Sequence, residues 1–199
     1  MLPIAREFQR VFILGTLLLL LLQFWQVEIF ILPWVAWLLF AFFVRDFNRE
    51  VPPNPLAAIS PVDGTISAVE PQFDPFLNRP ATRYSLKQYS LGEFNLHSPT
   101  EGKIEQLWVT EPSAKKKALA FWIKTDEDDD VVVHVELNSF IQHASTTLHP
   151  GERVGQGRRC GFVAPGCKVH IYLPENTQKV AKVSDKIVAG RSVISNYIH

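Results

Sequence analysis

Residues 163–174, VAPGCKVHIYLP, decide the fold of the soluble part of the chain. The first half of this stretch has the proline and glycine of a turn, and KVHIYLP alternates polar and apolar side chains as a half-buried strand does. Cys167 lies at the junction of turn and strand. It is therefore either a small buried apolar residue or a thiol that the turn presents for chemistry.

Similar alternating runs, bounded by Gly, Pro, Asp and Asn, recur along the chain after residue 56: TISAVE, KIEQLWV, LAFWIK and VVVHVEL. The turn motif SPVDGTI at residues 60–66 recurs as SPTEGKI at residues 98–104. No amphipathic helix of three turns stands out, and LNSFIQHAS, residues 137–145, is predicted as a short helix. The sequence predicts a mainly β domain, an antiparallel barrel or sandwich built from two similar halves.

The N-terminal quarter of the chain is strongly apolar. Residues 11–44 contain no Lys or Arg and are interrupted by Gln23, Gln26 and Glu28. One straight helix over this range would be about 51 Å long, against a hydrocarbon core of about 30 Å. Two short helices that form a membrane hairpin fit better, and whether they cross the bilayer or enter one leaflet stays open at this point.

Three segments follow from this pattern. We expect an α-helical membrane hairpin in residues 1–45, a charged, proline-rich linker in 46–56 and the β domain in 57–199. Arginines flank both arms of the hairpin, so the positive-inside rule places both flanks in the cytoplasm. A cleaved signal peptide fits less well, because the apolar region is too long and lacks a small-x-small exit.

Charge and cysteine content exclude some classes of protein. The chain has 20 basic and 20 acidic residues, so no basic excess points to a nucleic-acid partner. Cys160 and Cys167 are too few for a disulfide framework, although a single bridge between them is possible. Their spacing is not that of a zinc site, and no metal is expected.

Three residues are candidates for chemistry. Asp63 lies in the first turn motif, His97 directly precedes the second, and Cys167 follows Gly166. Taken singly, each has an ordinary structural interpretation: a turn aspartate, a structural histidine and a buried cysteine.

The order of the sequence blocks carries more information than any one of them. An apolar hairpin is followed by FFVRDFNREVPPNP, ISPVDGTI, HSPTEGKI, GERVGQGRRCGFVAPGCKVHIYLP and VSDKIVAGRSVIS. This order resembles the phosphatidylserine decarboxylase family, in its short bacterial and archaeal form, over residues 42–195. The resemblance implies a proenzyme that cuts its own backbone, forms a pyruvoyl group and converts phosphatidylserine to phosphatidylethanolamine.

The resemblance also implies a location and partners. It places the protein in the bacterial inner membrane, with the soluble domain on the cytoplasmic face and a phospholipid as substrate. No nucleic-acid partner is implied, and a homo-oligomer is compatible with the sequence.

Site residues are carried over by position. Asp63 matches the aspartate of the family's Pro-x-Asp-Gly turn, and His97 matches a histidine before the second turn. Gly166 and Cys167 fall on the family's Gly-Ser cleavage pair, so Cys167 would be the precursor of the pyruvoyl cofactor. By the logic of a hydrolytic triad, Asp63 would orient His97, and His97 would take the proton from residue 167.

The chain departs from the family at several positions. Cysteine replaces the pyruvoyl-forming serine, Phe94 stands where members commonly have a second histidine, and Pro165 replaces a large apolar residue. Two alternatives to an active enzyme follow. One is an uncleaved, inactive homologue that binds phospholipid or acts as a membrane-tethered adaptor. The other is a lipoyl-type carrier in which Lys186 would bear the swinging arm.

Overall fold

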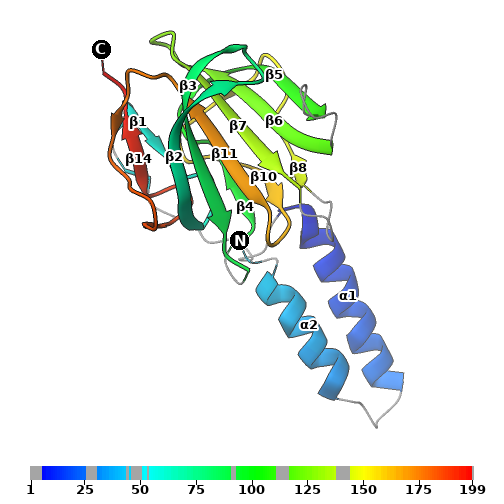
Figure 1. Ribbon diagram of the computed structural model, residues 1–199. Coiled ribbons are helices and arrows are strands. Elements are labelled where there is room, and N and C mark those ends of the chain that lie inside the picture. The colour runs from blue at the N-terminus through cyan, green and yellow to red at the C-terminus, as the bar shows by residue number, and fades with distance from the viewer. Residues whose placement is uncertain are drawn as a thin grey trace. The chain divides into compact units, whose positions relative to one another are not determined.

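The chain consists of two compact units, Met1–Asn48 and Arg49–His199. Figure 1 shows the computed structural model, which describes residues 6–25, 31–43, 45, 51–52, 54–90, 93–110, 117–137 and 144–198.

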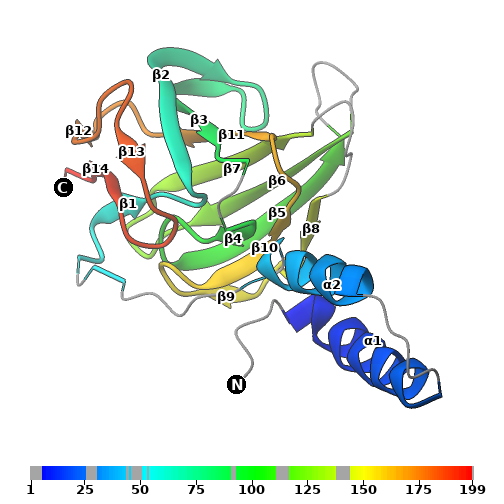
Figure 2. The same cartoon turned by 90° about the horizontal axis from the view of Figure 1, so that it is seen from below.

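The first unit contains two apolar helices, α1 (Arg6–Trp25) and α2 (Ile31–Phe43), which lie side by side in Figures 1 and 2. The rings of Phe12 and Trp37 stack with their centroids 5.3 Å apart, and Trp37 Nε1 donates a hydrogen bond of 2.9 Å to Thr16 Oγ1. This bond satisfies a polar group inside an apolar segment. The predicted pair of N-terminal helices is confirmed. Of the predicted break, Gln23 lies inside α1, where the helix continues to Trp25, and Gln26 and Glu28 lie outside the described residues.

Among the described residues, only α1 is long and apolar enough to cross a membrane by length and composition, over Phe8–Trp25. Its 20 residues correspond to about 30 Å of helix, close to the thickness of the hydrocarbon core. The second helix has 13 residues and reaches only about 20 Å.

The second unit is built from antiparallel strands, as the sequence predicted. Its largest sheet has eight strands in the order β13-β2-β3-β11-β7-β6-β5-β9, and this sheet curls strongly (Figure 2). In that order the strands are Lys186–Ile187, Gly64–Asp74, Arg79–Gln88, Lys168–Leu173, Asp130–Glu136, Lys117–Lys124, Gly102–Thr110 and Arg153–Val154.

Two three-stranded sheets complete the domain. The first has the order β1-β14-β12 and contains Ala57–Ile59, Val193–Asn196 and Gln178–Lys179. The second has the order β4-β10-β8 and contains Asn95–His97, Arg159–Val163 and Ala144–Thr146. The curled sheet and these two small sheets enclose one large apolar core.

The core forms because alternate residues of the long strands face inward. On β7, Val131, Val133 and Val135 are fully buried, and Phe121 of β6 and Ile171 of β11 join them. Each such side chain contributes roughly 1.5–3 kcal/mol on burial.

The two Ser-Pro-x-acid-Gly turns, residues 60–64 and 98–102, are joined symmetrically. The residue before each serine donates its backbone N–H to the proline carbonyl of the other turn, at 2.9 Å in both cases: Ile59 to Pro99 and His97 to Pro61. Each serine hydroxyl also donates a bond of 2.7 Å to the carbonyl two residues on: Ser60 to Val62 and Ser98 to Thr100. The predicted construction from two similar halves therefore corresponds to a local two-fold relation between the turns.

One predicted element is wrong where the structure describes it. The helix expected at residues 137–145 mostly falls on 138–143, which lie outside the described residues. Its last two residues belong to β8, where Ala144 pairs with Val163 and Ser145 with Phe162. Pairing with β10 overrides the weak local preference for a helix.

Candidate functional site

Cys167 lies between a tight turn and a central strand. Gly166 has a φ of 78°, a left-handed conformation that residues with a side chain rarely adopt, so the turn requires glycine there. Cys167 itself is 1% exposed and belongs to the apolar core. The next residue, Lys168, begins β11 and pairs with Lys87 of β3.

The start of this turn is held by two neighbouring segments. Val163 donates its backbone N–H to the carbonyl of Phe94 at 2.8 Å. The Gln88 side-chain amide donates a longer bond, 3.4 Å, to the carbonyl of Val163. Gln88 pairs in turn with Gly64, the residue after Asp63. The strand ends next to Asp63, Gln88 and Cys167 therefore lie at the same end of the curled sheet.

Asp63 is half-buried and uses its carboxylate to hold two backbone segments. Its Oδ1 accepts a hydrogen bond of 2.8 Å from the N–H of Ala189, and its Oδ2 accepts one of 3.3 Å from the N–H of Glu93. Asp63 thus fixes the start of the segment that leads through β4 to His97.

His97 is the last residue of β4 and is 5% exposed. Its Nδ1 lies 2.9 Å from the carbonyl oxygen of Gly157. A carbonyl can only accept a hydrogen bond, so the hydrogen-bond network assigns the proton of the neutral ring to Nδ1. Nε2 then carries the lone pair and can act as a base, and it lies 3.8 Å from Oε1 of Glu93.

The structure therefore relates the predicted residues indirectly. Among the described residues, the contacts of the His97 ring nitrogens are with Gly157 and Glu93, and Asp63 reaches His97 through the backbone of Glu93. Val163, four residues before Cys167, is bonded to Phe94, the residue after Glu93. Direct orientation of His97 by Asp63 stays a prediction.

A buried polar group surrounds Glu93 and is not marked by any motif of the sequence. The Asn95 side-chain amide donates a hydrogen bond of 2.6 Å to Oε1 of Glu93, and Arg159 Nε donates one of 2.8 Å to Oδ1 of Asn95. Glu93 and Asn95 are both 1% exposed. A signal was present in the sequence, because Glu93 is the single acidic residue in residues 91–100.

Gln88 was also missed. It is 3% exposed, yet its Oε1 has no hydrogen-bond partner among the described residues. A buried amide oxygen without a partner is costly, and such groups are often found at functional sites. Gln88 ends RPATRYSLKQ, a stretch that has no clear strand pattern in the sequence, so nothing singled this residue out.

The structure also bears on the possible disulfide and on metal binding. Cys160 and Cys167 are both free thiols, so the alternative of a single disulfide is wrong. Burial raises the pKa of the Cys160 thiol, which donates a hydrogen bond of 3.3 Å to the carbonyl of Leu96. The described residues contain no group of three or more His, Cys, Asp or Glu side chains placed to hold a metal ion.

The lipoyl-type alternative also fails on geometry. Lys186 lies in β13 and pairs with Thr65 of β2, so it is part of a strand. A swinging-arm lysine would need to project from the tip of a hairpin.

Comparison with known proteins gives a consistent result. The family model described as "Phosphatidylserine decarboxylase" matches residues 37–195. A phosphatidylserine decarboxylase proenzyme from Nitrosomonas europaea is 32% identical, over 88% of this chain and 82% of its own length. The proenzyme of Nitrosomonas eutropha is 31% identical over 89% and 88%, and that of Burkholderia multivorans 30% identical over 81% and 82%.

The family model covers well over half of the chain, and the matched region contains both repeated turns, His97 and the turn at Gly166. The chain belongs to the phosphatidylserine decarboxylase family, a family of carboxy-lyases.

Proposed function

We propose that this protein is a membrane-associated, self-processing decarboxylase that converts phosphatidylserine to phosphatidylethanolamine with a pyruvoyl group made from Cys167. The observation that carries the proposal is the position of the Gly166–Cys167 bond. It lies in a left-handed turn at the start of β11, at the sheet end next to Asp63 and beside the segment that bears His97. The names of the matched relatives, all proenzymes, support the same reaction class.

The processing step needs a nucleophile and a base. In the proposed step His97 Nε2 takes the thiol proton of Cys167, and the sulfur attacks the carbonyl carbon of Gly166. The bond from that carbon to the nitrogen of residue 167 breaks and the nitrogen takes up a proton, which leaves a thioester. Loss of the Cα proton of residue 167 then breaks its Cβ–S bond.

This elimination has a chemical signature. The sulfur stays on Gly166 as a thiocarboxylate, and residue 167 becomes a dehydroalanine that water converts to pyruvoyl with release of ammonia. A serine at the same position would instead leave an ordinary carboxylate on Gly166. The identity of the atom on the new C-terminus therefore reports the route of cleavage.

The residues present fit a pyruvoyl group at position 167. The position is small, 1% exposed and follows a glycine with a φ of 78°, so the new terminus would be held at the start of β11 and away from bulk water. When present, the group supplies an electron sink for the carbanion that loss of carbon dioxide leaves. The free Oε1 of Gln88 offers an acceptor for the amino group of the serine headgroup at the same end of the sheet.

The membrane association proposed here rests on α1. Its apolar window, Phe8–Trp25, is long enough to anchor the enzyme in the bilayer that holds its lipid substrate. Arginines on both sides of the helical pair favour the cytoplasmic face of the bacterial inner membrane for the β domain.

Intact mass spectrometry of the purified chain tests the proposal. We expect two fragments, one ending at Gly166 with a thiocarboxylate and one beginning with pyruvoyl at position 167. Cys167→Ala should stay uncut, and Cys167→Ser should give the same fragments with a carboxylate on Gly166. A single full-length chain from a preparation that decarboxylates phosphatidylserine would overturn the proposal.

Phe94 favours a second candidate function, an uncleaved homologue that binds phospholipid. Its side chain is 2% exposed and packs edge-on against Phe162, with ring centroids 6.3 Å apart, where the family commonly has a histidine. This candidate predicts a full-length chain that binds phosphatidylserine vesicles and releases no carbon dioxide. The same mass measurement separates the two functions.

A further inference from the structure

We propose that Glu93 is a positioning residue that stabilises the protonated form of His97 during self-processing. The inference rests on the proposed function and concerns a residue outside the proposed triad of Asp63, His97 and Cys167. The inference rests on the position of the buried Glu93 carboxylate, which lies beside Nε2 of the His97 ring.

The two nitrogens of His97 face different partners. Nδ1 is held by the carbonyl oxygen of Gly157 at 2.9 Å, which leaves Nε2 as the nitrogen that accepts a proton. Oε1 of Glu93 lies 3.8 Å from Nε2. When the ring takes up a proton at Nε2, the new positive charge therefore forms beside a carboxylate.

Burial makes this interaction effective. The side chain of Glu93 is fully buried and that of His97 is 6% exposed, so water screens the pair poorly. The Glu93 carboxylate stabilises the positive charge that His97 carries after it accepts the proton, and this stabilisation favours the proton transfer. The carboxylate of a hydrolytic triad contributes in the same way.

The neighbours of Glu93 fix its orientation. Asn95 donates a hydrogen bond of 2.6 Å to Oε1, and Arg159 orients the Asn95 amide by donating a bond of 2.8 Å to its Oδ1. The backbone N–H of Glu93 is held by Oδ2 of Asp63 at 3.3 Å. Asp63 thus positions the segment, and Glu93 supplies the charge next to the ring.

Three arginines lie on segments that adjoin His97. Arg159 lies directly opposite His97 in the pairing of β10 with β4. Arg158 and Arg191 each follow a glycine that approaches the ring, namely Gly157 and Gly190. Arg159 Nε is bonded to Asn95 and Arg158 Nη1 lies 3.5 Å from Oε1 of Glu152, so Glu93 carries the charge that lies beside Nε2 of His97.

The first measurement does not depend on cleavage. In the full chain carrying Cys167→Ala, held in detergent micelles, the protonation midpoint of His97 is followed by NMR of its ring nitrogens. We expect Glu93→Gln to lower this midpoint, because the negative charge that lies 3.8 Å from Nε2 is lost. Glu105→Gln, the same change at a partly exposed position of β5, should leave the midpoint unchanged. An unchanged midpoint in Glu93→Gln would overturn the inference.

The second measurement uses the chain with Cys167 intact and follows fragment formation against pH. Glu93→Gln should slow cleavage and move the acid limb of the rate profile to lower pH, whereas a purely structural role would lower the rate without moving the limb. Glu93→Asp keeps the charge and should retain part of the rate, which covers the case in which the glutamine variant does not fold. If the wild-type chain never yields fragments, self-processing fails, and the titration still decides the role of Glu93.

Discussion

His170 lies in the middle of β11, on the face of the sheet opposite the main core. It pairs with Ser85 of β3 on one side and with His134 of β7 on the other. Nδ1 of His170 is 3.0 Å from the Ser85 hydroxyl, and Nε2 is 3.5 Å from Oε2 of Glu136. Burial lowers the pKa of His170 from its ordinary value of 6.5, and the hydrogen bond to Glu136 only partly offsets this effect.

The lowered pKa of His170 gives the stability of the domain a defined pH dependence. Between the folded pKa and 6.5 the unfolded chain binds more protons than the folded one, so stability present above pH 6.5 is lost as the pH falls through this window. His170→Asn, which can keep the contact to Ser85, should reduce this loss in urea unfolding measured above and below pH 6.5. His149→Asn, at a side chain that is 82% exposed, serves as the control. An undiminished loss in His170→Asn would contradict the prediction.

The candidate residues that could be predicted from the sequence lie in or beside turns. Asp63, His97 and Cys167 all adjoin Pro and Gly positions that stand out in the sequence. Glu93 and Gln88 did not stand out, because their importance comes from burial next to segments that are distant along the chain. Burial of a carboxylate is decided by tertiary packing, which residue spacing does not reveal.

At the scale of elements, the helical pair depends on one close approach. A Cβ added to Gly15 would lie 2.2 Å from the ring of Trp37, too close for any side chain without a shift of the indole or of α2. Thr16 accepts a hydrogen bond of 2.9 Å from the same indole, so a close packing contact and a hydrogen bond join the two helices at this point.

Gly15→Val should therefore separate the helices. Overpacking at this contact is expected to cost about 1–3 kcal/mol, with faster amide hydrogen exchange in α2 when the full chain is measured in micelles. Leu21→Val, at a position that is 67% exposed, introduces the same β-branched side chain away from α2 and should leave exchange unchanged. Equal exchange in the two variants would show that the contact does not hold the pair together.

Strands with clear alternation were predictable from the sequence, and the others were not. The runs TISAVE, KIEQLWV, LAFWIK, VVVHVEL and KVHIYLP all correspond to strands β2, β5, β6, β7 and β11. Strand β3 was missed because RPATRYSLKQ has a proline at its second position and carries charges along its length. The two-residue strands β9, β12 and β13 exist only through their partners, so no local pattern could announce them.

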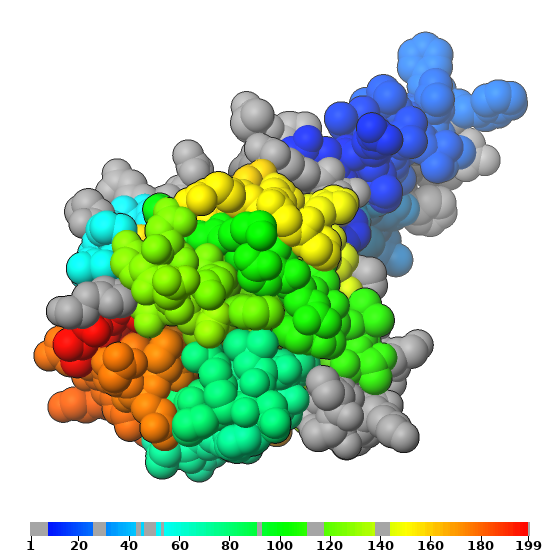
Figure 3. Space-filling view, turned by 90° about the horizontal axis from the view of Figure 1, so that it is seen from above, coloured from blue at the N-terminus to red at the C-terminus, as the bar shows by residue number. Residues whose placement is uncertain are grey.

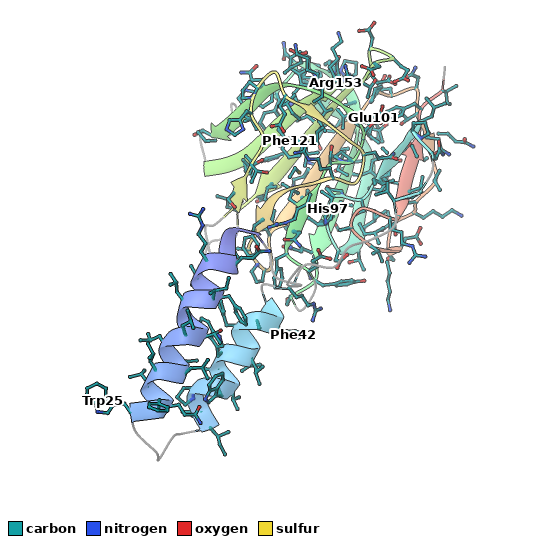
Figure 4. All side chains as sticks on the ribbon, turned by 180° about the vertical axis from the view of Figure 1, so that it is seen from behind. Trp25, Phe42, His97, Glu101, Phe121 and Arg153 are labelled. Atoms are coloured by element: carbon teal, nitrogen blue, oxygen red, sulfur yellow. The ribbon has the colours of Figure 1, made fainter. Side chains whose placement is uncertain are left out.

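Within the β domain, the two repeated turns place their acidic residues in different environments. Gly157 and Gly190, with φ values of 70° and 68°, both approach the ring of His97. The residues at matching places in the two motifs differ: Asp63 is half-buried and bonded, whereas Glu101 is exposed (Figure 4). The repeat could be read from the sequence, but the placement of Gly157 and Gly190 beside His97 required the structure.

A break at Gly166 would leave the C-terminal piece enclosed by the rest of the domain. Strand β11 pairs with both β3 and β7, β14 pairs with β1, and β13 pairs with β2. Figure 3 shows the C-terminal residues, orange to red, packed beside the β2–β3 hairpin in teal. We expect both pieces to elute together in gel filtration without denaturant and to separate in urea. Loss of the small piece under native conditions would contradict this expectation.

The position of β11 has a thermodynamic consequence. The uncut chain unfolds as one molecule, whereas the cut protein unfolds into two, so its unfolding midpoint should rise with protein concentration. The Cys167→Ala chain should show no such dependence. Cleavage would thus convert a folded state that a single chain can regain into a complex of two chains whose stability depends on concentration. Unfolding of the mature protein would not restore the uncut chain.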